Sequence, residues 1–271
     1  MMTQKVVVIG GDGLIGRALQ RHPYSVEMTF YSHTLGGSYK YFDINDANTW
    51  GSIASKGYKR AILLSWLYLD DYNTKRHFTE NLSHSIMLVD RLINNGLTEL
   101  VVAGTCYEYG NQSGCLSPNL NTKPLTSYGI AKDSLNKVLS HMCSISDVRF
   151  CWARIFYPYS IDQRKTSLFP ALLEKSKLQN NIIELGNPDL IRDFIPTEDI
   201  AKCLVNLISN KSASGVFNCG SGNPISLRTF VEKIIKKYSL CVEPRFNMVQ
   251  PRKFEPMAFW ADMSNWDELD I

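Results

Sequence analysis

The chain has 271 residues, 44% of them hydrophobic, and a formal net charge of +3. This length suits one large α/β domain or one domain with an added lobe. The charges are scattered without a basic block, so we expect no nucleic-acid partner. No apolar run approaches the ~20 residues that cross a bilayer, and the run at 6–9 ends in glycines, so we expect neither a membrane segment nor a targeting segment.

The cysteine content indicates the compartment. The chain has seven cysteines, an odd number, and no two of them form a Cys-x-x-Cys pair. Most lie in apolar sequence surroundings. The sequence therefore predicts reduced thiols in a cytoplasmic protein, and we assign no metal site.

The first pattern with chemical meaning is a glycine-rich turn. Residues 5–9 form a β-branched run typical of a buried parallel strand, and residues 17–21 predict a helix. Three glycines between them have the spacing Gly-x-x-Gly-x-x-Gly, which lets a pyrophosphate approach bare backbone and the free N–H groups of a helix start. The alternative is a glycine-rich turn without a chemical role. The residues expected to contact a dinucleotide here are Gly10, Gly13, Leu14, Ile15 and Gly16.

The next predicted strand, 26–31, bears on which dinucleotide binds. NAD-binding proteins usually place Asp or Glu at the end of this strand to hold the ribose hydroxyls. Here the strand ends at Ser32 and His33 without an acid. These two residues and Arg17 suit a 2′-phosphate, so the sequence favours NADPH. The alternative is that they are ordinary loop residues and that ribose specificity lies elsewhere, which leaves NAD possible.

Further cofactor contacts are expected at the ends of the next two strands. A short strand at 41–44 places Asp43 where an adenine amino group would lie, next to Ile44. A buried strand at 60–65 ends at Ser65. Helices are predicted at 46–55 and 70–94, and the second of these carries Asn81.

A strand at 99–103 and a helix at 127–146 carry the candidate catalytic residues. Thr105 follows the strand end, where open α/β sheets place their chemistry. Tyr128 and Lys132 are four residues apart, so they share one helix face. A lysine ammonium beside a tyrosine should lower the tyrosine pKa, so that the pair exchanges a proton with a hydroxyl near neutral pH. The alternative is an exposed helix pair.

The second half of the chain is less regular. A strand at 148–155 is followed by helices at 167–177, 197–209 and 227–238, with a strand at 216–218 before the last helix. No repeat or low-complexity linker separates the halves. We expect a dinucleotide-binding domain at 1–157, to which 191–212 returns, and a substrate lobe made of 158–190 and 213–271.

In this order the motifs resemble the extended short-chain dehydrogenase/reductase family, and specifically its nucleotide-sugar epimerase/dehydratase/reductase branch. The resemblance covers nearly the whole chain. Residues 192–199, Arg-Asp-Phe-Ile-Pro-Thr-Glu-Asp, are similar to a signature of that branch, and the tail from 252 to 264 resembles a segment with a second phosphate-contacting arginine. The resemblance implies an α/β fold: a Rossmann-type doubly wound parallel sheet with a smaller, interwoven C-terminal substrate lobe.

The resemblance also implies roles for single residues. Thr105, Tyr128 and Lys132 would form the catalytic triad, with Tyr128 and Lys132 also at the cofactor and Asn81 in a proton relay. Thr105 and Tyr107 would contact a nucleotide-sugar substrate. Bidentate guanidinium groups suit its diphosphate, which would be bound by Arg192 and Arg252. Family members commonly dimerise through the helix that carries the tyrosine, so we expect a homodimer.

Departures from the branch narrow the reaction. Dehydratases place Asp-Glu after the catalytic hydroxyl residue, where this chain has Cys106 and Tyr107. The cysteine of epimerase-reductases lies one position further on. Simple hydride transfer at a ring carbon remains: an NADPH-dependent 4-ketoreductase making a deoxyhexose donor for O-antigen or capsule, or an NAD-retaining 4-epimerase. A non-enzymatic cofactor-binding regulator is a further alternative, although such proteins usually lose the tyrosine or lysine.

Overall fold

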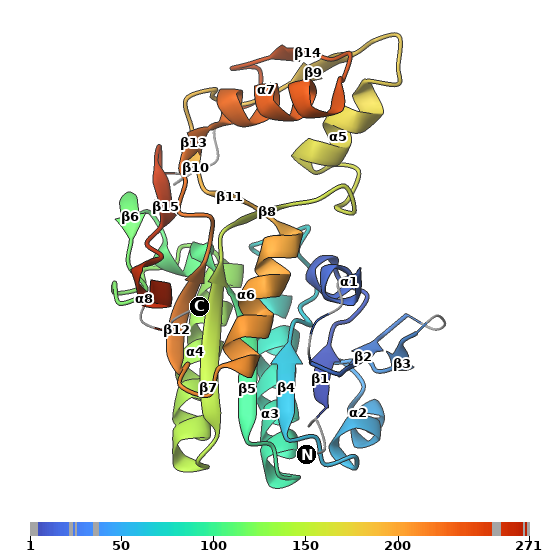
Figure 1. Ribbon diagram of the computed structural model, residues 1–271, viewed down its shortest axis with the longest axis vertical. Coiled ribbons are helices and arrows are strands. Elements are labelled where there is room, and N and C mark those ends of the chain that lie inside the picture. Colours follow the sequence, from blue (N-terminus) through green and yellow to red (C-terminus); the bar gives the residue numbers. More distant parts are fainter. Residues whose placement is uncertain are drawn as a thin grey trace.

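A computed structural model of the chain describes residues 5–21, 24, 26–34, 38–250, 256–267 and 269. Arg252, an expected substrate ligand, lies outside these residues. The core is a seven-stranded parallel sheet in the order β12-β7-β5-β4-β1-β2-β3, shown below a smaller lobe in Figure 1. Its strands are β1 (Val6–Ile9), β2 (Met28–Ser32), β3 (Lys40–Tyr41), β4 (Arg60–Leu63), β5 (Glu99–Thr105), β7 (Arg149–Ile155) and β12 (Gly215–Cys219).

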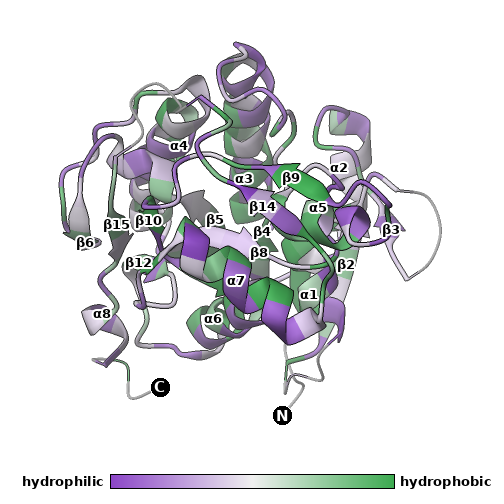
Figure 2. Cartoon of the chain, turned by 90° about the horizontal axis from the view of Figure 1, so that it is seen from above, coloured by the Kyte–Doolittle hydropathy of each residue, from purple (hydrophilic) through white to green (hydrophobic). Residues whose placement is uncertain are grey.

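Helices cover both faces of the sheet because its strands are apolar on both sides. All four residues of β1 have no exposed surface. One face packs against α1 and α6 and the other against α2, α3 and α4, as Figure 2 shows from above. This is the doubly wound arrangement that the resemblance implied. The five helices are α1 (Leu14–Arg21), α2 (Ala47–Ala54), α3 (Ser83–Asn94), α4 (Ser127–Ile145) and α6 (Thr197–Ser209).

The strand order changes direction at β1. From β1 the chain proceeds outward to β2 and β3, and then returns to β4 on the other side of β1. The N–H groups of Leu64 and Ser65 both donate to the carbonyl of Ile9, which draws the ends of β1 and β4 together. In open α/β sheets, the crevice at such a point, beyond the carboxyl ends of the strands, is where ligands bind.

The lobe has its own small core and lies beyond that edge of the sheet (Figure 1). In Figure 2 purple and green residues alternate along α7, and its buried residues include Phe230 and Ile234. Phe230 stacks on Phe194, with 3.9 Å between ring centroids. The lobe elements are α5 (Leu168–Lys175), β9 (Ile182–Glu184), β13 (Ile225–Ser226), α7 (Leu227–Tyr238) and β14 (Glu243–Arg245).

Short strand pairs interweave the lobe with the sheet. The parallel pairs β8–β11 and β6–β15 join segments far apart in the sequence, and β10 pairs with β13. The sequence patterns did not predict these short strands, because two or three residues show no periodicity. The connecting elements are β6 (Gly114–Leu116), β8 (Tyr157–Tyr159), β10 (Ile191–Arg192), β11 (Phe194–Pro196), β15 (Phe259–Ala261) and α8 (Ser264–Asp267).

The structure differs from the sequence expectations in three places. The strand expected at 41–44 is β3, which covers only Lys40–Tyr41, so Asp43 and Ile44 follow the strand. The helix expected at 70–94 begins at residue 77, with a π-helical segment η1 (His77–Leu82) before α3. The preceding residues form turns, since Tyr68 has a φ of 64° and the Asp71 carboxylate accepts the N–H of Asn73. The expected lobe segment 213–271 also contains β12, which pairs with β7 in the central sheet.

One buried carboxylate fastens the connecting segments together. Asp193, between β10 and β11, has no exposed surface. It accepts hydrogen bonds from the N–H groups of Ser221, Gly222 and Ala261, at 2.7, 3.0 and 3.1 Å. The carboxylate therefore joins three segments that come from separate parts of the sequence.

Replacing Asp193 by Ala should lower the free energy of unfolding by about 3 kcal/mol, because three buried N–H groups lose their acceptor. Urea unfolding followed by tryptophan fluorescence measures the change. Asp189→Ala removes an exposed carboxylate of the same region and should stay within about 0.5 kcal/mol of the native protein. Equal stabilities of the two variants would contradict this role.

Candidate active site

The glycine turn after β1 is packed so closely that side chains are excluded. Gly10 has a φ of 96°, and a Cβ atom there would lie 2.7 Å from the backbone nitrogen of Ser65. A Cβ atom on Gly16 would overlap the carbonyl of Gly11. The turn leads directly into α1, whose first residues include Leu14 and Ile15. Bare backbone beside a helix start fits the pyrophosphate of a dinucleotide.

A cavity of about 200 Å³ adjoins this turn at the ends of β1, β2 and β4. It gathers most of the residues expected to contact the adenosine half of the cofactor. Trp66, expected near the cofactor edge, also lines it. Sequence reasoning had not selected the remaining lining residues, which are Asp12, Phe42, Asn45, Leu64 and Leu67. The expected residues in the lining are Gly10, Gly13, Ser32, His33, Asp43, Ile44 and Ser65.

Arg17 is held away from the role expected of it. Its guanidinium donates to the main-chain carbonyls of Asp12 and Asp162, the latter at 2.9 Å. Arg17 is not among the residues that line the cavity with Ser32 and His33. Asp162 belongs to the segment between β8 and α5, so Arg17 instead ties the glycine turn to that segment.

Thr105 and Tyr128 meet at the carboxyl end of β5. Thr105 is the last residue of β5, and its side chain is hydrogen-bonded to that of Tyr128. Helix α4 begins beside it, because the Thr126 side chain caps the helix by accepting the N–H of Gly129. Tyr128, one residue into the helix, is 9% exposed. The structure therefore joins two of the three expected catalytic residues directly.

Lys132 lies one turn further along α4 and is also buried. Its Nζ donates to the carbonyl of Ala103 at 2.7 Å and lies 3.9 Å from the centre of the Trp66 ring. Burial lowers the pKa of Lys132 to about 7. Trp66 also contacts Tyr128 edge-on, at 6.0 Å between centroids, so one indole touches both residues.

The expectation that Lys132 lowers the tyrosine pKa is wrong for the chain alone. Burial raises the pKa of Tyr128 above its ordinary value, and the hydrogen bond with Thr105 offsets this only in part. The ammonium of Lys132 is directed to the Ala103 carbonyl instead of the phenol. Tyr128 is therefore protonated at neutral pH in the chain alone.

Asn81 is fully buried, but its hydrogen bonds lead to Leu67. Its side chain accepts the N–H of Leu67 at 2.9 Å and donates to the carbonyl of the same residue at 3.0 Å. Both bonds fix the loop after β4, which carries Trp66. A relay through Asn81 stays a prediction, and the contacts observed give it a positioning role.

Two expected substrate residues also lie at this edge. Tyr107 and Tyr72 pack against the Tyr128 ring, with centroids 6.0 and 5.2 Å from it. Arg192 is 3% exposed, and its guanidinium lies 4.7 Å from the Phe259 ring centre and donates to the carbonyl of Ile191. The aromatic side chains therefore pack around Tyr128, while Arg192 lies below the surface.

Comparison with known proteins agrees with this geometry. A family model described as the NAD dependent epimerase/dehydratase family matches residues 6–220, which include the glycine turn, Thr105 and Tyr128. The chain belongs to this family. The resemblance to extended short-chain dehydrogenases/reductases is thereby confirmed, and with it dependence on NAD or NADP. The family comprises nucleotide-sugar epimerases, reductases and dehydratases.

Individual relatives are more distant. dTDP-6-deoxy-L-talose 4-dehydrogenase (NAD(+)) of Aggregatibacter actinomycetemcomitans is 29% identical over 199 residues, which are 73% of each chain. dTDP-4-dehydro-6-deoxyglucose reductase of Escherichia coli is 26% identical over 168 residues, covering 60% of this chain and 52% of the relative. The structure of RMD from Pseudomonas aeruginosa complexed with NADPH aligns with a TM-score of 0.84 at 18% identity, covering 99% and 91% of the chains. That likeness supports the fold alone.

Sequence reasoning missed the buried ion pair between Glu108 and Arg154, which supports this site. Glu108 has no exposed surface and accepts the N–H of Thr105 at 2.8 Å and the Nε of Arg154 at 2.7 Å. The Trp152 indole donates to the same carboxylate. The Thr-x-x-Glu spacing of a capping box was the available signal. Trp152 and Arg154 are two residues apart on β7, so their side chains lie on the same face of the sheet.

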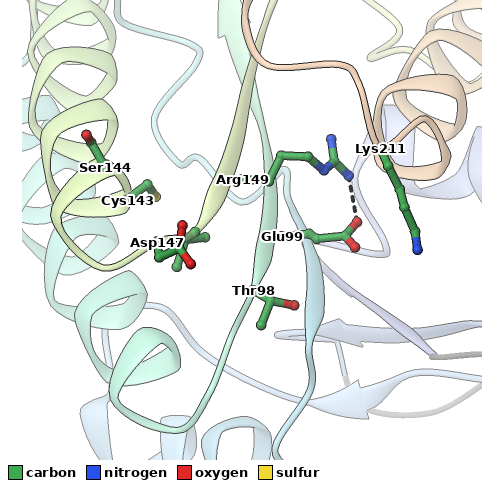
Figure 3. Close-up of a pocket in the computed structure, with 8 residues that line it drawn as sticks. Thr98, Glu99, Cys143, Ser144, Asp147, Arg149 and Lys211 are labelled. Atoms are coloured by element: carbon green, nitrogen blue, oxygen red, sulfur yellow. Dashed lines mark hydrogen bonds and ion pairs between the residues drawn. The ribbon is translucent and has the colours of Figure 1, made fainter.

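A second cavity lies at the opposite end of the strands. It measures about 500 Å³ and opens beside the first residues of β5 and β7, as Figure 3 shows. Arg149 there binds Glu99 at 2.6 Å and the last carbonyls of α6. These contacts neutralise the charges and cap the helix, so we assign this cavity no part in the chemistry. Among the described residues, no helix is both long and apolar enough to cross a membrane.

Replacing Lys132 by Met should change how stability depends on pH. Between its folded-state pKa of about 7 and its ordinary value of 10.5, the unfolded chain holds a proton on Lys132 that the folded chain releases. The wild-type protein should therefore gain about 1.4 kcal/mol in stability per pH unit across this window, and the Met variant should lack this contribution. The free energy of unfolding of Lys132→Met, taken relative to that of the wild type, should therefore fall as pH rises.

Urea unfolding at pH 7, 8 and 9 measures both proteins. The exposed Lys211, changed to Met, is the matched control and should keep the wild-type slope. Parallel curves for Lys132→Met and the wild type would contradict the buried, weakly basic lysine.

Proposed function

We propose that the chain is an NAD(P)H-dependent 4-ketoreductase of a nucleoside-diphosphate 4-keto-6-deoxyhexose, producing a deoxysugar donor. The observation that supports it most is the buried Thr105–Tyr128 hydrogen bond at the end of β5. The two residues that follow Thr105 are Cys106 and Tyr107, so neither supplies a carboxylate for dehydration. The nearest carboxylate in the sequence, that of Glu108, is held by Arg154. The names of two relatives, a 4-dehydrogenase and a 4-keto reductase of dTDP-sugars, support the same reaction class.

The side chains divide the reaction between them. The nicotinamide, when bound, supplies the hydride for the carbonyl carbon. Tyr128 donates its proton to the carbonyl oxygen as negative charge develops there, and Thr105 supports the resulting phenolate by donating to it. Lys132 places a titratable amine between β5 and Trp66, where its positive form stabilises the same charge. Arg192 and Arg252 are proposed, as in the sequence analysis, to bind the diphosphate.

The NADPH preference predicted from the sequence rests on the missing carboxylate at the end of β2. The reaction proposed is the same with NADH, because the 2′-phosphate is remote from the nicotinamide. The family alone supports dependence on NAD or NADP.

The main alternative is an NAD-retaining nucleotide-sugar 4-epimerase, because the family includes epimerases and both reactions need the same tyrosine. A non-enzymatic regulator is less consistent with the site, since Tyr128, Lys132 and Thr105 are all retained and buried together. The cytoplasmic location and a role in O-antigen or capsule synthesis are proposals from the sequence.

The purified protein should oxidise NADH or NADPH in the presence of a dTDP-, CDP-, GDP- or UDP-linked 4-keto-6-deoxysugar. Tyr128→Phe should lower turnover at least ~100-fold with little change in cofactor affinity, because it removes only the proton donor. Tyr238→Phe, in the exposed part of α7, makes the same chemical change away from the site and should retain full activity. Interconversion of 4-hydroxy epimers without net cofactor oxidation would support the epimerase instead.

We also propose that the protein forms a homodimer through α3 and α4. These neighbouring helices expose Met87, Ile130, Val138 and Ile145 in the single chain, and a dimer contact there would remove these apolar side chains from water. Light scattering should give twice the chain mass of 30.7 kDa. Val138→Glu should shift the protein to monomer, whereas Leu178→Glu, at a more exposed apolar site in the lobe, should not. A monomeric wild type would contradict the proposal.

A further inference from the structure

The glycine turn places the carboxylate of Asp12 beside the end of β2. Asp12, between Gly11 and Gly13, accepts a hydrogen bond from the Thr34 hydroxyl, and its Oδ2 lies 3.5 Å from Nδ1 of His33. Both partners directly follow Ser32, the last residue of β2. Asp12 also lines the 200 Å³ cavity together with Ser32 and His33. The sequence has no acid at the end of β2, but the fold brings the Asp12 carboxylate to that position.

The backbone around Asp12 is fixed from both sides. The N–H groups of Gly10 and Gly11 both donate to the carbonyl of Tyr31, at 2.9 Å each, so the turn is tied to β2. A Cβ atom on Gly11 would lie 2.8 Å from Cβ of Phe30, which shows how closely the two segments pack. Arg17 holds the Asp12 carbonyl from the other side. The Asp12 side chain, 18% exposed, therefore has a fixed origin beside the β2 end.

In dinucleotide-binding folds of this type, the adenosine ribose lies at the end of the second strand. A carboxylate there accepts hydrogen bonds from the ribose hydroxyls and repels a 2′-phosphate. We propose that Asp12 is the residue that selects NAD(H) over NADP(H), in place of an acid at the end of β2. This deepens the proposed function and rests on it, since a nicotinamide cofactor must bind.

The surrounding charges favour this assignment. His33 faces Asp12, and Arg17 donates to two main-chain carbonyls, so neither side chain is directed at the ribose corner alone. The expectation of NADPH considered only residues 31–33 and the sequence-distant Arg17. It did not include Asp12, because a residue inside the glycine turn lies about twenty positions before the strand end that it reaches.

Direct binding tests the proposal without any sugar substrate. NADH and NADPH are titrated separately into the full-length protein, and the nicotinamide fluorescence gives each Kd. The wild type should bind NADH at least about tenfold more tightly than NADPH. Asp12→Asn keeps the side-chain size but removes the charge, so it should shrink this ratio about tenfold, mainly through tighter NADPH binding.

Asp43→Asn is the matched control, because it removes a carboxylate from the same cavity at a position expected to meet the adenine instead of the ribose. It should weaken both cofactors alike and leave their ratio within about twofold of the wild type. Asp12→Ser is a second variant for the case that Asp12→Asn folds poorly, as checked by thermal unfolding.

A wild type that prefers NADPH, or a ratio unchanged in both Asp12 variants, would overturn the proposal while leaving the reductase reaction intact. Selective NADH binding without turnover on any keto-sugar would leave Asp12 selectivity standing and overturn the proposed reaction. A protein that binds neither cofactor would overturn both.

Discussion

The buried carboxylate of Glu108 fixes the carboxyl end of β5, where Thr105 lies. It accepts from the backbone of Thr105, the indole of Trp152 and the guanidinium of Arg154, all of them N–H donors. A buried charge with this many partners is costly to disturb, because removal of one partner leaves another uncompensated. Thr105 thereby acquires a fixed backbone, and its hydroxyl remains directed at Tyr128. The geometry on which the proposed proton transfer depends is therefore set by residues outside the trio of Thr105, Tyr128 and Lys132.

Burial then determines the chemistry of that trio. The same low-polarity surroundings raise the pKa of Tyr128 and lower that of Lys132, so the tyrosine keeps its proton and the lysine gives one up near neutral pH. A protonated tyrosine can donate to a substrate oxygen as charge develops there, which is the role that ketone reduction requires. Trp66, which contacts both side chains, is placed by the loop that Asn81 holds.

Patterns of local sequence predicted the parts that local physics determines. Buried β-branched runs predicted the central strands, and the close packing of Gly10 and Gly16 explains why the glycine turn was recognisable. Contacts between distant segments were beyond reach: the Glu108–Arg154 pair, the Asp193 junction and the placement of Asp12 at the β2 end. The pKa of Tyr128 was predicted in the wrong direction because spacing reveals a neighbouring lysine but not the depth of burial. The helix that carries Asn81 begins later than expected, because residues before 77 form turns that the apolar periodicity of the segment does not reveal.

The central claim is that hydride passes from added cofactor to the sugar ring, with Tyr128 supplying the proton. The most direct measurement uses NADH or NADPH deuterated at the transferred position of nicotinamide C4, with a 4-keto-6-deoxysugar nucleotide. Reduction predicts one deuterium per product molecule, located at sugar C4 by NMR, and at least ~100-fold less labelled product with Tyr128→Phe over the same period. Product without deuterium at C4, or label found at another ring carbon, would contradict the account.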